Sequence, residues 1–266
     1  MRIVFDHVFP RYILTMVLFL TLSPTSGFPQ EWTSRKVVGP FVCWGTFDLR
    51  VVETDIQSLG TISQELSTRL RVPPPQEWVE VYIFRDENEW HAFLRREYPE
   101  LPYRRALFLK KPAHRGQLFL YLSPDFAVDI RHEGTHALLH AVLPDVPIWL
   151  DEGLAEYYEV AHNRAYDSIW LREILLKAKE KRIQKLKTLE KKSGMASMTD
   201  DDYADAWAWV NYLLNGPEEV RTVLPEYLAA LATEKKPAPI SKRLAKILRN
   251  PDEQLRLYFL DNMEKP

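Results

Sequence analysis

Two histidines one helical turn apart are the residues of this sequence best placed to do chemistry. His132 and His136 lie in a segment whose apolar positions predict a helix over residues 127–141. Residues four apart on a helix share one face, with roughly 5–6 Å between their Cβ atoms. Two imidazole rings at that separation can bind one metal ion.

A third ligand is needed, because a zinc ion in a protein takes at least three protein ligands and a catalytic one keeps a further position open. Glu152 is the candidate, since it lies on a second predicted helix, from about Pro147 to Val160. The short connection before this helix, which contains Pro144, would let it fold back over the first. Two imidazoles and a carboxylate favour zinc by ligand type, so we expect one Zn²⁺ ion.

Glu133 follows His132 directly and completes the pattern His-Glu-x-x-His. A carboxylate at this place can take a proton from an attacking water molecule, which is the chemical reason for its presence in the pattern. A pattern with two free positions also occurs by chance, and the nearby segment from Trp149 to Ala155, which contains Glu152, makes chance a poorer explanation.

His140 continues the stripe of histidines and needs a separate interpretation. It lies roughly 12 Å along the helix axis from His132, because each residue adds about 1.5 Å. Both cannot reach one ion at bonding distance. We expect a packed or hydrogen-bonded histidine.

The two motifs together resemble the gluzincins, the peptidase MA-like group of zinc metallopeptidases, over about residues 79–231. In that family the two histidines of the pattern and a downstream glutamate bind zinc, which implies the same roles for His132, His136 and Glu152, with Glu133 as the catalytic base. The implied reaction is the hydrolysis of a peptide bond, and the implied partner is a peptide or protein substrate. The sequence is similar to exported bacterial proteins of the peptidase MA-like type.

The resemblance implies roles for three further residues. Tyr203 begins a segment similar to the tyrosine-led helix of the aminopeptidase branch, where the tyrosine hydroxyl stabilises the oxyanion. Tyr212 is the alternative residue for this role. Tyr203 could instead have only a structural role and pack its helix against a neighbouring one. Glu156 lies one turn after Glu152 and is expected either to accept a hydrogen bond from a zinc-binding histidine or to be a solvated helix residue. Asp151 is expected to cap or line the second helix.

One departure from the family limits the function. The aminopeptidase branch carries a Gly-x-Met-Glu-Asn segment that captures a free amino terminus, and this sequence has none. An aminopeptidase is therefore not predicted. Two alternatives stay open beside the peptidase: a zinc-binding pseudo-enzyme or binding module, and a zinc amidase acting on a non-protein substrate such as a cell-wall peptide.

The composition is that of an ordinary globular protein. The chain has 266 residues, of which 46% are hydrophobic and 27% are charged, with a net charge of -2. This balance gives no argument for a nucleic-acid partner. Cys43 is the only cysteine, so no intrachain disulfide can form, and we expect it to be a buried small apolar residue.

The N-terminal residues differ from the rest in character. An apolar run from Tyr12 to Leu22 comes after Arg2 and Arg11 and is followed by a turn-prone segment of small residues that ends at Gly27. The run is shorter than the ~20 residues that span a bilayer, so residues 1–27 predict a cleaved signal peptide and export to the periplasm or medium. An uncleaved membrane anchor is the alternative. Residues 28–266 are expected to form a single domain.

The fold class expected is α+β, with a small mixed sheet, the histidine helix at its edge and a helical C-terminal half. In gluzincins an edge strand lies beside the cleft, and Gln117–Leu122 is expected to be that strand or else an interior one. The lysines between Trp170 and Leu186 are expected on a solvated helix surface rather than in a binding patch. Strands are predicted at 47–53, 80–84, 105–109 and 117–122, and helices at 55–70, 88–98, 170–186, 203–215, 218–232, 240–249 and 252–261.

Overall fold

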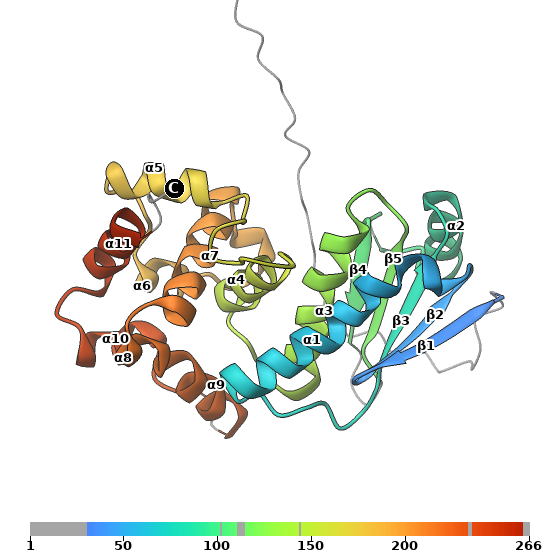
Figure 1. The fold of residues 1–266 in the computed structure, drawn as a ribbon, viewed down its shortest axis with the longest axis horizontal. Helices are drawn as coiled ribbons and strands as arrows, with labels where there is room; N and C mark the ends of the chain where they lie inside the picture. The colour runs from blue at the N-terminus through green and yellow to red at the C-terminus, as the bar shows by residue number, and fades with distance from the viewer. Residues whose placement is uncertain (1–30, 102, 111–114, 144, 234–235, 263–266) are drawn as a thin grey trace, which may run out of the picture.

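The computed structural model describes residues 31–101, 103–110, 115–143, 145–233 and 236–262. The predicted leader, residues 1–27, lies outside them. Among the helices described, none combines the length and the apolar character that crossing a membrane requires. The fold is α+β, with a mixed five-stranded sheet and a larger helical part (Figure 1).

The sheet has the strand order β1-β2-β3-β5-β4. The inner strands β2, β3 and β5 run parallel, whereas the outer strands β1 and β4 are antiparallel to their neighbours. The expectation that Gln117–Leu122 forms an edge strand is therefore wrong, because β5 lies between β3 and β4. The bounds are β1 Ser34–Val38, β2 Phe41–Gly45, β3 Val79–Phe84, β4 Ala106–Leu109 and β5 Gln117–Tyr121.

Helices cover both faces of the sheet, so its central strands are apolar on both sides. Helices α1 (Glu53–Leu70) and α3 (Phe126–Val142) pack on one face, where Val81 and Ile83 belong to the main core. Helix α2 (Glu87–Glu97) packs on the other face against a separate aromatic cluster that includes Tyr82.

The C-terminal half is helical, and its helix α4 lies next to α3. Helix α4 (Ile148–Tyr158) packs against both α3 and α7 (Asp200–Asn215). Figure 1 shows α4 and α7 side by side between the sheet and the remaining helices. Those are α5 Leu171–Lys179, α6 Leu186–Leu189, α8 Glu218–Arg221, α9 Val223–Thr233, α10 Ile240–Ile247 and α11 Pro251–Asn262.

Three predicted elements are wrong in type or length. The alternating residues 47–53 form a 3₁₀ turn, Leu49–Val52, capped by the Asp48 side chain, and the true strands β1 and β2 precede it. The helix predicted over residues 218–232 is two helices, because Pro225 has no N–H and can occupy only a first turn.

The helix predicted over residues 170–186 is also shorter, since α5 ends at Lys179 and Lys181 adopts a positive φ of 58°. One of its lysines is not on a solvated surface. Lys177 is only 3% exposed, and its Nζ lies 2.7 Å from Oδ1 of the buried Asp205 on α7. This ion pair connects α5 to α7.

Cys43 is buried in β2, as expected.

Candidate metal centre

Helix α3 is buried over most of its length, which places its polar residues in the interior. It packs against α1, α4 and the strands β3, β4 and β5. His132, Glu133 and His136 have no exposed surface. Imidazole and carboxylate groups are rarely buried without a partner that compensates for lost hydration. Their burial therefore requires an explanation.

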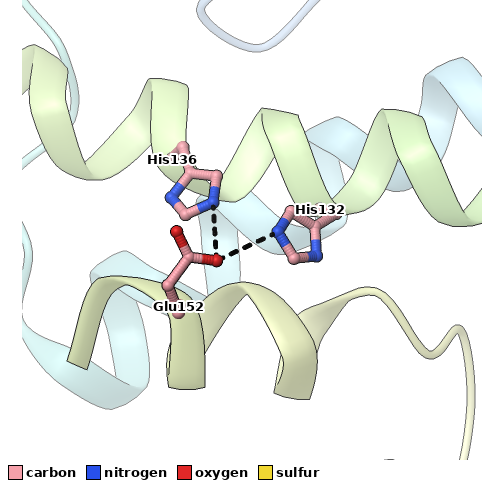
Figure 2. Close-up of side chains that lie close together, drawn as sticks. All are labelled: His132, His136 and Glu152. Atoms are coloured by element: carbon pink, nitrogen blue, oxygen red, sulfur yellow. Dashed lines mark ion pairs between the residues drawn. The ribbon is translucent and has the colours of Figure 1, made fainter. Parts of the chain in front are cut away.

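The structure brings Glu152 of α4 to the two histidines, as the sequence predicts. Its Oε2 atom lies 3.7 Å from Nε2 of His132 and 3.8 Å from Nε2 of His136. Figure 2 shows both rings of α3 directed at one oxygen of this carboxylate across the gap between the two helices. These separations are too long for hydrogen bonds. They are within the distance of about 4.4 Å that two ligand atoms of one zinc ion can span.

Six buried polar atoms in this cluster have no hydrogen-bond partner. They are Nε2 of His132, Nε2 of His136, both carboxylate oxygens of Glu152 and both carboxylate oxygens of Glu133. An unpartnered buried polar atom costs about 1–3 kcal/mol, and more when it is charged. Six such atoms in one place fit a metal ion with a base beside it, and the ligand types fit zinc.

The second nitrogen of each histidine ring is held by a carboxylate. Nδ1 of His132 lies 3.0 Å from Oε2 of Glu159, and Nδ1 of His136 lies 2.9 Å from Oδ1 of Asp151. Such contacts place the proton on Nδ1 and leave Nε2 free to bind a metal. Asp151 therefore does more than line α4, because it orients a candidate ligand.

Glu156 has a different partner from the one expected. Its Oε2 accepts a hydrogen bond of 2.6 Å from Nε1 of Trp170. Glu159, and not Glu156, occupies the position beside Nδ1 of His132. Glu156 is nevertheless buried next to this pair, and burial, together with the charge of Glu159, raises its pKa to about 8.

His140 is a hydrogen-bonded histidine, as predicted. Its Nε2 lies 2.8 Å from Oδ2 of Asp151, so one carboxylate connects His136 and His140. The contact with His140, together with that to His136, offsets the cost of burying Asp151, and the pKa of Asp151 is lowered.

The electrostatics of Glu133 suit a general base. Burial raises its pKa to about 7, although the nearby His136 and His132 act in the opposite direction. A base works best when its pKa lies near the operating pH. The pKa of His132 is also raised, because Glu152 and Glu159 outweigh the lowering effect of burial.

Tyr203 lies in the first turn of α7, which begins with a capping box formed by Thr199 and Asp202. The charges of Glu152, Glu156 and Arg104 act on its hydroxyl, and burial raises its pKa, so it stays a neutral donor. Tyr212 packs elsewhere, against Trp209 and Tyr258, and the acidic residue acting on its hydroxyl is Glu219. Of the two tyrosines, Tyr203 is the one whose hydroxyl is affected by the charges of the candidate centre.

Two residues of the site were not anticipated from the sequence. Glu159 lies seven residues, about two helical turns, after Glu152, and this spacing on one face could have revealed it. Arg104 lies in the segment before β4, and no local sequence pattern marks it.

No protein-family model matches the chain, and a search of curated proteins finds no match.

Proposed function

We propose that this protein is a zinc-dependent hydrolase that cleaves peptide bonds, of the gluzincin type. The observation that carries the proposal is the set of six unpartnered buried atoms on His132, His136, Glu152 and Glu133. A cluster of this kind is costly unless a cation binds it. The resemblance of the two sequence motifs to the peptidase MA-like group supports the same conclusion.

Each residue has a defined role in this proposal. His132, His136 and Glu152 would hold the ion, while Asp151 and Glu159 orient the two imidazole rings. Zinc bound there would supply a Lewis acid that polarises a carbonyl group and makes water more acidic.

Two further side chains carry out proton transfer and charge stabilisation. Glu133 takes the proton of the attacking water and passes it to the leaving amine, a task for which its raised pKa of about 7 is suited. The hydroxyl of Tyr203 donates a hydrogen bond to the oxygen on which negative charge develops.

The test is the substitution Glu133→Gln, which keeps the shape of the side chain and removes the base. We expect the variant to bind one zinc ion per chain, as the native protein does, and to hydrolyse a casein or peptide-library substrate at least 10²-fold more slowly. Metal analysis and product detection by mass spectrometry give the two readouts. Hydrolysis at the native rate would contradict the proposed base.

Two other results would replace the proposal. A native chain that binds zinc but cleaves no peptide would be a zinc-binding module. A chain that cleaves peptidoglycan fragments and leaves casein intact would be a cell-wall amidase. Both substrates should therefore be offered to the same zinc-loaded sample.

A further inference from the structure

Arg131 is a buried arginine that directly precedes the first candidate ligand and has no role in the proposed reaction. It is only 7% exposed, although its side chain carries a full charge. A buried guanidinium is costly unless its N–H donors are bonded. The contacts that it makes inside the protein therefore indicate what it does.

The main contact joins α3 to the end of α4. Nε of Arg131 donates a hydrogen bond of 2.5 Å to the backbone carbonyl oxygen of Glu159. Glu159 is the first residue after α4, where carbonyl groups have no partner within the helix. On its other side, Nη1 of Arg131 lies 3.9 Å from Oδ1 of Asp55, in the first turn of α1. Arg131 therefore connects three helices.

Glu159 also contacts α3 through its side chain. Its Oε2 lies 3.0 Å from Nδ1 of His132, the residue that follows Arg131. Two neighbouring residues of α3 thus hold one residue of α4, Arg131 by the backbone carbonyl and His132 by the carboxylate. Because helix ends fray, the bonding within α4 does not by itself fix the position of this carboxylate.

A second arginine bonds the next carbonyl in a similar way. Nε of Arg164 donates a hydrogen bond of 2.9 Å to the carbonyl oxygen of Val160. Its Nη1 lies 2.8 and 2.7 Å from the two carboxylate oxygens of Glu65 on α1. Two successive carbonyls after α4 are therefore bonded to arginines that reach carboxylates of α1. Of the two arginines, Arg131 is the one that bonds Glu159 itself.

We propose that Arg131 is a positioning residue for the candidate metal centre. It holds Glu159 where the carboxylate of this residue meets Nδ1 of His132, and the ring then presents Nε2 to the centre. Partners that orient a metal-binding histidine affect metal affinity without touching the metal. The effect on zinc rests on the proposed function, whereas the effect on the His132 ring does not.

The first readout needs no metal. A ring N–H that donates to a buried carboxylate exchanges slowly with solvent, because exchange requires local opening. Heteronuclear NMR of the metal-free native chain should show such a proton for His132, and its loss in Glu159→Ala assigns the signal. Arg131→Gln keeps both partners of this hydrogen bond. It should nevertheless speed the exchange roughly tenfold or more, as expected when a hydrogen bond from a charged group is lost.

The second readout is zinc affinity, measured by competition with a chelator. Arg131→Gln should weaken zinc binding about tenfold, the lower end of the range for residues that orient a ligand. In a Glu159→Ala chain the same substitution should change the affinity less than about threefold, because the carboxylate through which Arg131 acts is absent. Arg131→Lys keeps the charge without the guanidinium fork and should lie between the native chain and Arg131→Gln. It replaces Arg131→Gln in both readouts if that variant does not fold.

The control is Lys177→Gln, which removes another buried cation. The partner of Lys177 is Asp205 on α7, far from the end of α4 along the chain. Its loss should lower the unfolding free energy of the metal-free chain, measured by urea denaturation, and leave both the ring proton of His132 and zinc affinity as they are in the native chain. This control separates positioning from a general loss of stability.

The outcomes separate the two proposals. Faster exchange in Arg131→Gln but not in Lys177→Gln supports the inference even if the native chain binds no zinc, in which case the proposed function alone fails. Native exchange in Arg131→Gln, or equal acceleration in Lys177→Gln, overturns the inference whatever the chain binds or cleaves. A loss of zinc affinity that is as large without the Glu159 carboxylate as with it also overturns the inference.

Discussion

The Oδ1 atom of Asp151 lies 2.9 Å from Nδ1 of His136, while Nε2 of the same ring faces Glu152. This contact fixes the orientation of the ring and the nitrogen that carries the proton. Asp151→Asn removes the negative charge from this position, so we expect zinc affinity to fall 10–100-fold. Competition with a zinc chelator measures the change.

The matched control for this substitution is Asp145→Asn. Asp145 is exposed and lies six residues before Asp151, so its loss should leave zinc affinity unchanged. Glu159→Gln should lower affinity in the same way as Asp151→Asn, through His132. An unchanged affinity in both variants would contradict the role given to these carboxylates.

The two tyrosines of α7 form a second matched pair. Tyr203→Phe removes the hydroxyl on which the charges of Glu152 and Arg104 act, and we expect kcat to fall by 10²–10³, the usual effect of losing one oxyanion donor. Zinc content should not change. Tyr212→Phe alters a hydroxyl in a different environment and should keep the native kcat; equal losses in both variants would argue against a specific role for Tyr203.

The stability of the metal-free chain should fall as the pH rises. Burial raises the pKa of Glu133 from 4.5 to about 7, and for His132 nearby carboxylates outweigh burial and raise the pKa above 6.5. Both groups therefore hold protons in the folded chain at pH values where the unfolded chain has released them. Stability is lost between pH 4.5 and 7 through Glu133, and from 6.5 upward through His132.

Chemical denaturation between pH 5.5 and 8.5, with and without zinc, checks this expectation. The metal-free chain should lose a few kcal/mol of unfolding free energy over this range, and zinc should stabilise the protein more at pH 8.5 than at 5.5, because a metal ligand must be deprotonated. Glu133→Gln should reduce the decrease below pH 7, to which Glu156 also contributes through its raised pKa, and keep the one above it. A flat profile for the metal-free chain would contradict the prediction.

The sequence predicts well which side chains come together at the candidate centre, because part of this arrangement depends on local spacing. His132 and His136 share a face in any helix, and α3 and α4 have strong apolar patterns on both sides of a proline-containing connection. The meeting of Glu152 with the two rings is a tertiary contact, which the sequence could only indicate. The position of Arg104 could not be predicted from the sequence, because it depends on a hydrogen bond between its backbone carbonyl and Trp90 and not on any periodic sequence pattern.

Short elements were predicted less well for a related reason. Residues 47–53 alternate in polarity as a strand would, but the side chain of Asp48 accepts from the Arg50 backbone and turns the chain into a 3₁₀ helix. The sheet begins earlier, at Ser34, with two five-residue strands whose pairing is nonlocal. The burial of Lys177 could likewise not be predicted from the sequence, since its partner Asp205 is distant along the chain.

Gly153, next to Glu152, sets how closely α4 approaches α7. A Cβ atom at this position would lie 2.8 Å from the carbonyl oxygen of Ala206 and 2.9 Å from Cγ2 of Val210. Gly153→Ala should therefore lower the unfolding free energy by about 1–3 kcal/mol, even though alanine favours a helix by about 1 kcal/mol. Urea denaturation of the metal-free chain measures this effect.

A second substitution separates backbone crowding from side-chain crowding at this contact. Val210→Ala relieves the clash with Cγ2 and leaves the carbonyl of Ala206 in place, so adding it to Gly153→Ala should not restore native stability. Helix α4 carries Glu152 and α7 carries Tyr203, so Gly153→Ala should move these two groups apart. It should therefore lower kcat more than it lowers zinc affinity. A Gly153→Ala chain as stable as the native one would show that the two helices can separate without cost.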